Sequence, residues 1–140
     1  MQVKEGRVFI GRLDHEGDLL DSLTSVCKEN NIKLGVFSVI GAVRGAKLGF
    51  YDQEQKKYEE RINIKKKLEI TSCNGNISLI DSDIFVHSHI TLVDREGNCY
   101  GGHLMPGSRI FAAEYYIKEL TGAVLARKND PETGLSLWEK

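Results

Sequence analysis

The sequence contains only three cysteines in 140 residues, and an odd number argues against a disulfide scaffold. Cys27, Cys73 and Cys99 are far apart and form no Cys-x-x-Cys pair. Cys27 falls in an apolar helical stripe, where a thiol behaves as a small buried hydrophobe. Cys73 and Cys99 fall in strand-like segments. We therefore interpret all three as packing residues.

Long hydrophobic runs are also missing. No apolar stretch approaches the ~20 residues that a helix needs to cross a bilayer. The first six residues, Met-Gln-Val-Lys-Glu-Gly, lack the apolar stretch of a signal peptide. We therefore expect a soluble protein in the cytoplasm, with no membrane partner.

The chain has no excess of basic charge. Lysine and arginine number 19 and aspartate and glutamate number 20, which gives a net charge of −1. Affinity for nucleic acid depends largely on cationic side chains that neutralise phosphates, so this balance gives DNA binding no support. The one basic cluster, Lys65–Lys67, has acidic neighbours, and we interpret it as a solvated hairpin edge.

The sequence predicts one globular domain over residues 1–140, because 41% hydrophobic and 28% charged residues are typical of such domains. One amphipathic helix is expected over residues 18–30. Asp18 suits the N-cap, and apolar residues follow at helical spacing. Asn30 or Asn31 can end the helix in the left-handed conformation.

Most of the remaining sequence predicts strands, so the expected fold class is α/β (α+β) with a mainly antiparallel, strongly twisted sheet. Asn74-Gly75 predicts a hairpin turn. Residues 108–120 favour a strand but would tolerate a second helix. Leu135, Leu137 and Trp138 are expected to pin the C-terminus to the body or to a neighbouring subunit. The predicted strands cover residues 6–13, 34–43, 46–51, 57–64, 68–73, 77–80, 84–93 and 99–104.

Two histidines alternate with a serine in one of these strands, His87-Ser88-His89. Side chains alternate faces along a strand, so His87 and His89 share the face opposite the apolar residues. Their Cα atoms are then about 6.5–7 Å apart. Two imidazoles at that separation can converge on one metal ion.

The following turn predicts a third ligand. Residues 94–98 fit a three-residue hairpin loop closed by a left-handed glycine. Counting back from this loop, His89 opposes His103, and directly opposite residues share a face. A bulge at Gly101-Gly102 is the alternative, and it would turn His103 to the other face.

Three neutral imidazoles suit zinc, copper, iron or nickel. Three protein ligands and an open fourth position are the zinc arrangement associated with catalysis, whereas a ligand from another chain would close the site. Arg44 or Arg7, if near the site, would bind an anionic substrate, but surface ion pairing is the preferred interpretation of each alone. His15 is interpreted as solvated. Candidate carboxylates for an outer shell or a general base are Glu69, Glu114, Asp81 and Asp83.

The His87-Ser88-His89 motif, followed by Gly101-Gly102-His103-Leu104, resembles the plants-and-prokaryotes conserved (PPC) domain, which also occurs in plant AT-hook proteins. The resemblance extends over about residues 6–120. Other matching segments are residues 17–20, 40–44, 48–52, 72–77 and 113–114.

The resemblance implies an α/β fold with a mainly antiparallel sheet and one or two helices. It also implies a homotrimer and, in prokaryotic members, a metal held by the three histidines. Members are commonly labelled DNA-binding proteins, but the Arg-Gly-Arg-Pro hook of the plant relatives is absent from this sequence.

Three functional hypotheses follow. The first is a trimeric, zinc-stabilised module that binds DNA or takes part in transcription. The second is a zinc-dependent hydrolase or lyase acting on a small molecule through the three-histidine site. The third is an oligomer in which the histidines only pack.

Overall fold

The predicted helix and its cap are confirmed. The computed structural model describes residues 1–139, and for residues 60 and 61 it describes the backbone alone. Helix α1 covers Leu19–Glu29, and the Asp18 carboxylate accepts hydrogen bonds from the backbone N–H groups of Leu20 and Asp21. Asn31 follows the helix with φ 52°, the left-handed conformation expected there. Within the described residues no helix is long and apolar enough to cross a membrane.

The strands of the described chain form one sheet that is almost entirely antiparallel. Its main order is β1-β8-β2-β5-β6-β7-β3-β4, and β9 pairs with both β5 and β10. The predicted fold class is therefore confirmed. The strands are β1 (Lys4–Leu13), β2 (Gly35–Val43), β3 (Ala46–Asp52), β4 (Lys57–Ile64), β5 (Leu68–Ile80), β6 (Asp83–Val93), β7 (Cys99–Leu104), β8 (Ile110–Thr121), β9 (Ala126–Asn129) and β10 (Ser136–Trp138).

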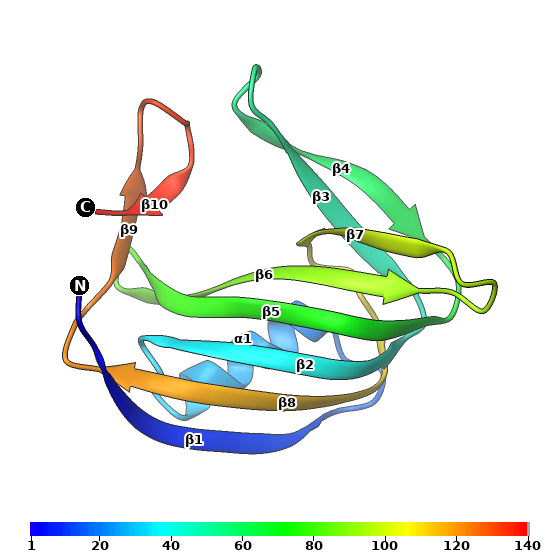
Figure 1. Cartoon of the computed structure of the whole chain (residues 1–140), viewed down its shortest axis with the longest axis horizontal. Coiled ribbons are helices and arrows are strands. Elements are labelled where there is room, and N and C mark those ends of the chain that lie inside the picture. Colours follow the sequence, from blue (N-terminus) through cyan, green and yellow to red (C-terminus); the bar gives the residue numbers. More distant parts are fainter. Residues whose placement is uncertain (140) are drawn as a thin grey trace.

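Helix α1 covers one face of the curved sheet and leaves the opposite face without a covering layer (Figure 1). Its buried residues Leu19, Leu23 and Cys27 pack with the inward side chains of the sheet. Those inward residues include Phe37, Val39, Ile77, Ile90 and Ile117, all at most 5% exposed. The core therefore lies between the helix and the sheet.

The predicted turn at Asn74-Gly75 is wrong, because β5 runs without interruption through both residues. Gly75 pairs with Phe37 on one side and with Ser88 on the other. A Cβ atom at this position would lie 2.6 Å from Phe37 Cζ and would overlap the His87 carbonyl oxygen. The glycine thus permits close packing inside the sheet, where the sequence pattern alone indicated a turn.

Two further predictions concern the C-terminal third of the chain. Residues 108–120 form strand β8, so the preferred strand is confirmed and the optional second helix is wrong. The sequence analysis assigned no strand after residue 120, and the tail contains the β9–β10 hairpin. β9 is held by parallel pairing with β5, at Leu79↔Ala126 and Ile80↔Arg127.

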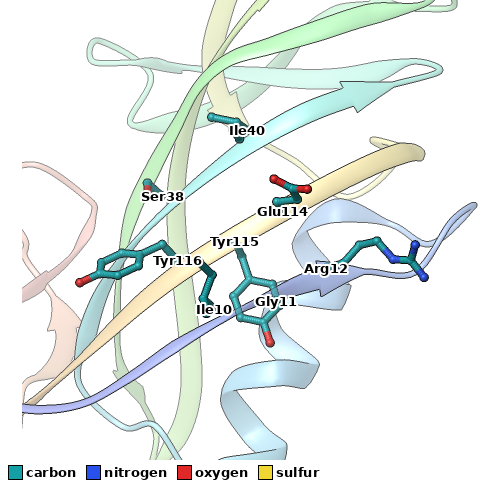
Figure 2. Close-up of a pocket in the computed structure, with 8 residues that line it drawn as sticks. All are labelled: Ile10, Gly11, Arg12, Ser38, Ile40, Glu114, Tyr115 and Tyr116. Atoms are coloured by element: carbon teal, nitrogen blue, oxygen red, sulfur yellow. The ribbon is translucent and has the colours of Figure 1, made fainter.

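The uncovered face of the sheet has an apolar area on β1, β8 and β2. Ile10 is 82% exposed and Ile40 is 59% exposed, and Val8, Val36 and Tyr116 are exposed beside them. Figure 2 shows Ile10, Ile40 and Tyr116 around a shallow hollow of about 500 Å³. We call these five residues the outer apolar face.

The β3–β4 and β9–β10 hairpins both project beyond the β6 side of the sheet (Figure 1). Hydrogen bonds connect them. The Tyr51 hydroxyl donates to the Thr133 carbonyl at 2.7 Å, and Lys56 Nζ donates to the Pro131 carbonyl at 3.0 Å. The two hairpins thereby enclose a space against β6 and β7.

Candidate metal centre

The predicted register of the histidine hairpin is confirmed. His89 on β6 pairs directly with His103 on β7, and the register continues without a shift to Val93↔Cys99. Gly101-Gly102 therefore forms no bulge here. Gly102 instead allows close approach of the next strand, because a Cβ atom there would lie 2.9 Å from the Gly49 carbonyl oxygen of β3.

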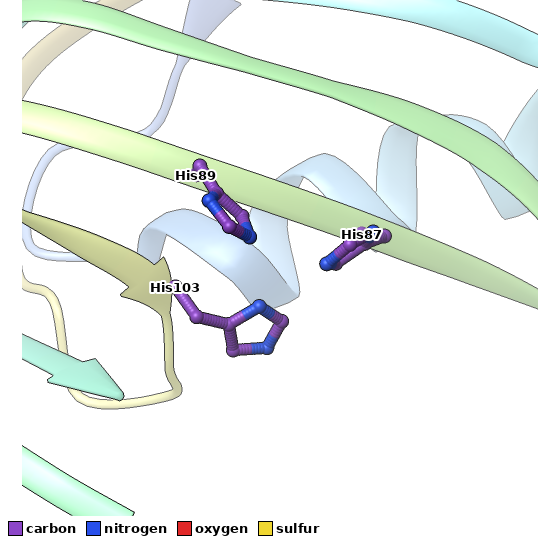
Figure 3. Close-up of side chains that lie close together, drawn as sticks. All are labelled: His87, His89 and His103. Carbon is purple, nitrogen blue, oxygen red and sulfur yellow. The ribbon is translucent and has the colours of Figure 1, made fainter. Parts of the chain in front are cut away.

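The three histidines form one cluster on the sheet face opposite α1. Figure 3 shows His87 and His89 projecting from β6 toward His103. The ring centroids are 5.0 Å apart for His87 and His103, 5.2 Å for His87 and His89, and 5.5 Å for His89 and His103. One nitrogen from each ring lies within 4.8 Å of the other two, so the cluster can hold a metal ion.

The donor atoms fit a metal better than they fit a packed core. His87 Nε2 and His103 Nδ1 are buried and have no hydrogen-bond partner among the described residues. Buried polar atoms in native proteins are normally paired, so these two nitrogens are available as ligands. Burial lowers the pKa of both His87 and His103 to about 4, and nearby positive charge adds to this effect. The rings are therefore neutral at pH 7, which is the form that binds metal.

The cluster borders a cavity of about 420 Å³ between the β3–β4 and β9–β10 hairpins. The Tyr58 ring packs against His103 at a tilt of 32°, with centroids 4.5 Å apart. The Phe85 ring lies 25° from parallel to His87, with centroids 6.5 Å apart. His87 and His103 both line this cavity. The described group of donors contains no carboxylate or thiolate, so these residues supply three nitrogen ligands and no fourth.

Arg127 on β9 is a cavity residue that the sequence analysis did not identify. Only 9% of it is exposed, and its positive charge contributes to the lowered pKa of His87. Nothing in the local sequence distinguishes it from other surface cations. Its position depends on the pairing of β9 with β5, which short-range patterns do not reveal.

The other predicted site residues lie away from the cavity wall. Arg44 pairs with Glu16 at 3.0 Å and packs over Phe111. Glu69 and Glu114 line a separate hollow that also contains Arg12. None of Arg44, Glu69 and Glu114 lines the cavity that contains His87 and His103.

The remaining candidates also have other surroundings. Arg7 forms an ion pair with Glu119 at 2.7 Å. His15, interpreted as solvated, is exposed, and its Nδ1 lies 2.6 Å from the Phe111 carbonyl. Asp81 and Asp83 are exposed at the turn between β5 and β6.

Several solved structures match over nearly the whole chain. A metal-containing protein from Archaeoglobus fulgidus is 39% identical with a TM-score of 0.93, covering 99% of this chain and 97% of that one. A plant- and prokaryote-conserved (PPC) protein from Pyrococcus horikoshii is 34% identical with a TM-score of 0.94, covering 99% and 95%. A Bacteroides thetaiotaomicron protein with a provisional DNA-binding name is 25% identical with a TM-score of 0.85, covering 98% and 96%.

Sequence comparison gives a curated relative and a family. The bifunctional protein GlmU of Synechococcus sp. (strain JA-3-3Ab) is 30% identical over 130 residues. These residues are 91% of this chain, which spans only about a fifth of that relative's length. The profile of the Plants and Prokaryotes Conserved (PCC) domain, also abbreviated PPC, matches residues 1–121. The chain therefore belongs to the Plants and Prokaryotes Conserved domain family.

Proposed function

We propose that this protein is a zinc-binding homotrimer whose metal centre faces a cavity for a small molecule. The observation that carries the proposal is the pair of buried, unpartnered nitrogens of His87 and His103 beside His89. Three imidazoles and no fourth protein ligand correspond to zinc sites that keep a position open for water or substrate. The name of the Archaeoglobus fulgidus relative, a metal-containing protein, agrees with this proposal.

The cavity favours binding of a small molecule over a purely structural metal. Its volume of about 420 Å³ is in the range of ligand sites, and its walls combine aromatic and cationic side chains. A bound zinc ion would supply Lewis acidity there, as in zinc hydrolases and lyases. No aspartate or glutamate is among the described lining residues, so the polar side chains that line the cavity carry imidazole, phenol, hydroxyl, ammonium and guanidinium groups.

Self-association is supported by the outer apolar face, and the number of three subunits follows from the family resemblance. Large exposed apolar areas on soluble proteins commonly mark subunit interfaces. Across the paired strands, one row of directly opposed residues joins this face to the metal centre: Ile10, Tyr116, Ser38, Asn74, His89 and His103. A neighbouring chain seated on the outer apolar face would therefore lie beside the histidines.

Native mass spectrometry tests the assembly and its metal together. We expect the wild-type mass to equal three chains and three zinc ions. Ile40→Lys places a charge in the outer apolar face and is expected to shift the population to monomer. Val124→Lys is the matched control, because Val124 is 71% exposed and lies outside this face. A wild-type monomer, or a trimer that survives Ile40→Lys as well as it survives Val124→Lys, would contradict the proposed interface.

DNA contact is the second candidate function. It is favoured by a basic hollow whose cations are Arg44, Arg95 and Lys65–Lys67, and by the name of the Bacteroides thetaiotaomicron relative. Asp94 and Glu96 line the same hollow, and Lys66 forms an ion pair with Asp94. The overall charge of −1 argues against strong attraction to phosphates.

Fluorescence anisotropy with random duplex DNA separates the two functions. We expect no binding that persists at about 0.15 M salt, because acidic residues line the basic hollow and the net charge of the chain is −1. Binding that persists there and is lost in a Lys65→Glu/Lys67→Glu double variant would support direct DNA contact and would overturn this expectation.

A further inference from the structure

Arg127 is a buried cation for which the described residues provide no carboxylate partner. Its Nε donates to Ser78 Oγ at 2.9 Å, its Nη1 to the Ser136 carbonyl at 2.9 Å, and its Nη2 to Asn76 Oδ1 at 2.8 Å. All three acceptors are neutral. Buried charges are normally paired with an opposite charge, so a guanidinium held in place by neutral groups alone is unusual.

The guanidinium is held rigidly as well as buried. Its Cζ lies 5.4 Å from the centroid of the Phe85 ring and 5.2 Å from that of the Trp138 ring. A guanidinium has five N–H donors, and three of them are used in the hydrogen bonds to β5 and β10. One donor on Nη1 and one on Nη2 therefore remain for a ligand. Such a pair of N–H groups matches the two oxygens of a carboxylate or phosphate.

The cavity beside Arg127 favours a negatively charged occupant. Arg127, Lys56 and Lys57 line it together with His87 and His103, and no acidic residue is among its described lining. Lys56 donates to the Pro131 carbonyl, and Lys57 lies 3.8 Å from Glu59. Neither Lys56 nor Arg127 is paired with a carboxylate among the described residues, but Lys56 is exposed to solvent whereas Arg127 is buried. Arg127 is therefore the buried cation of this wall that no described carboxylate offsets.

We propose that the cavity binds a small organic oxyanion, a phosphate monoester or a carboxylate, whose charged end is held by Arg127. The neutral part of the ligand extends along the aromatic wall of Tyr58 and Phe85 toward the histidine cluster. The cavity volume of about 420 Å³ suits such a ligand. This inference deepens the proposed function by assigning a chemical class to the occupant of the cavity.

The path from Arg127 to the cluster is short. Phe85 contacts the guanidinium on one side and lies parallel to the His87 ring on the other, with an interplanar angle of 25°. An anion bound by Arg127 would therefore lie beside the ring nitrogens of His87, His89 and His103.

The family profile matches residues 1–121 only, so it does not describe the segment that contributes Arg127, Ser136 and Trp138.

The single tryptophan provides a direct readout, because Trp138 lies against Arg127. The experiment titrates metal-free, chelator-treated protein with phenyl phosphate, benzoate and the uncharged benzyl alcohol, and follows Trp138 fluorescence and binding heat. We expect one of the two anions to saturate the signal and benzyl alcohol to have little effect. The stronger anion identifies the ligand as a phosphate ester or a carboxylate.

Three variants locate the binding. Arg127→Met is expected to weaken anion affinity by about tenfold or more, because the charge and its paired donors are lost. Arg127→Lys keeps the charge without the planar fork and is expected to weaken it less. Lys128→Met removes an exposed cation from the same strand and is expected to leave affinity unchanged, since Lys128 pairs with Glu139 at the surface.

The proposal is overturned if wild-type protein binds neither anion, if benzyl alcohol binds as tightly, or if Arg127→Met binds as wild type does. If Arg127→Met does not fold, Arg127→Lys replaces it in this test. Wild-type anion affinity in Arg127→Lys would then overturn the proposal. Because the titrated protein is metal-free, the measured anion affinity does not depend on whether the histidines bind zinc. Anion binding that persists in His89→Ala supports the oxyanion site even if no zinc is found in the wild type.

Discussion

Removal of zinc with a chelator is expected to lower the midpoint of thermal unfolding of the wild-type protein by about 10 °C. A metal that binds only the folded state stabilises it by about 4 kcal/mol when free zinc exceeds the dissociation constant about a thousandfold. For a chain of this size that free energy corresponds to a shift of roughly this extent. Differential scanning calorimetry with and without chelator measures it.

His89→Ala should abolish this response to chelator. His89 is exposed, so the substitution itself should cost little stability, and the variant should unfold near the temperature of metal-free wild type. His15→Ala is the matched control, because His15 is also exposed but is not in the cluster. A wild type that is insensitive to chelator, or a His89→Ala variant that still responds to it, would favour histidines that only pack.

Gly75→Ala is expected to destabilise the protein by about 3 kcal/mol or more, at the upper end of overpacking effects. The added methyl group would overlap the His87 carbonyl oxygen and would lie 2.6 Å from Phe37 Cζ. Neither neighbour can move easily, since one is backbone within β6 and the other is a buried ring. Urea unfolding monitored by circular dichroism measures the loss.

A second glycine of the same sheet provides the control. Gly101 lies on β7, where an added Cβ would meet only the Ile90 carbonyl at 3.3 Å and Thr91 Oγ1 at 3.5 Å. Gly101→Ala should therefore cost about 1 kcal/mol or less. Equal stabilities of the two variants would show that the β5 backbone can shift, and the explanation given for Gly75 would then fail.

Local geometry explains why the sequence predicts the histidine hairpin. The loop after Val93 fixes the pairing of β6 with β7, and the alternation of side chains then determines which residues share a face. His103 opposes His89 as a direct consequence. The helix was predictable for a similar reason, because the Asp18 cap and the apolar spacing lie within one short segment.

Long-range contacts explain what the sequence does not reveal. Gly75 looks like part of a hairpin turn, but its role depends on Phe37, which is distant in the chain. Arg127 reaches the cavity because β9 pairs in parallel with β5, about fifty residues earlier, as at Ile80↔Arg127. The cavity wall opposite the histidines therefore could not be predicted from spacing or periodicity.

Metal content is the most direct test of the central claim that the three histidines bind zinc. Elemental mass spectrometry on protein purified without a His-tag should find close to one zinc per wild-type chain. It should find almost none in His89→Ala, while His15→Ala keeps the wild-type content. Absence of metal from the wild type, or equal metal in wild type and His89→Ala, would contradict the proposed centre.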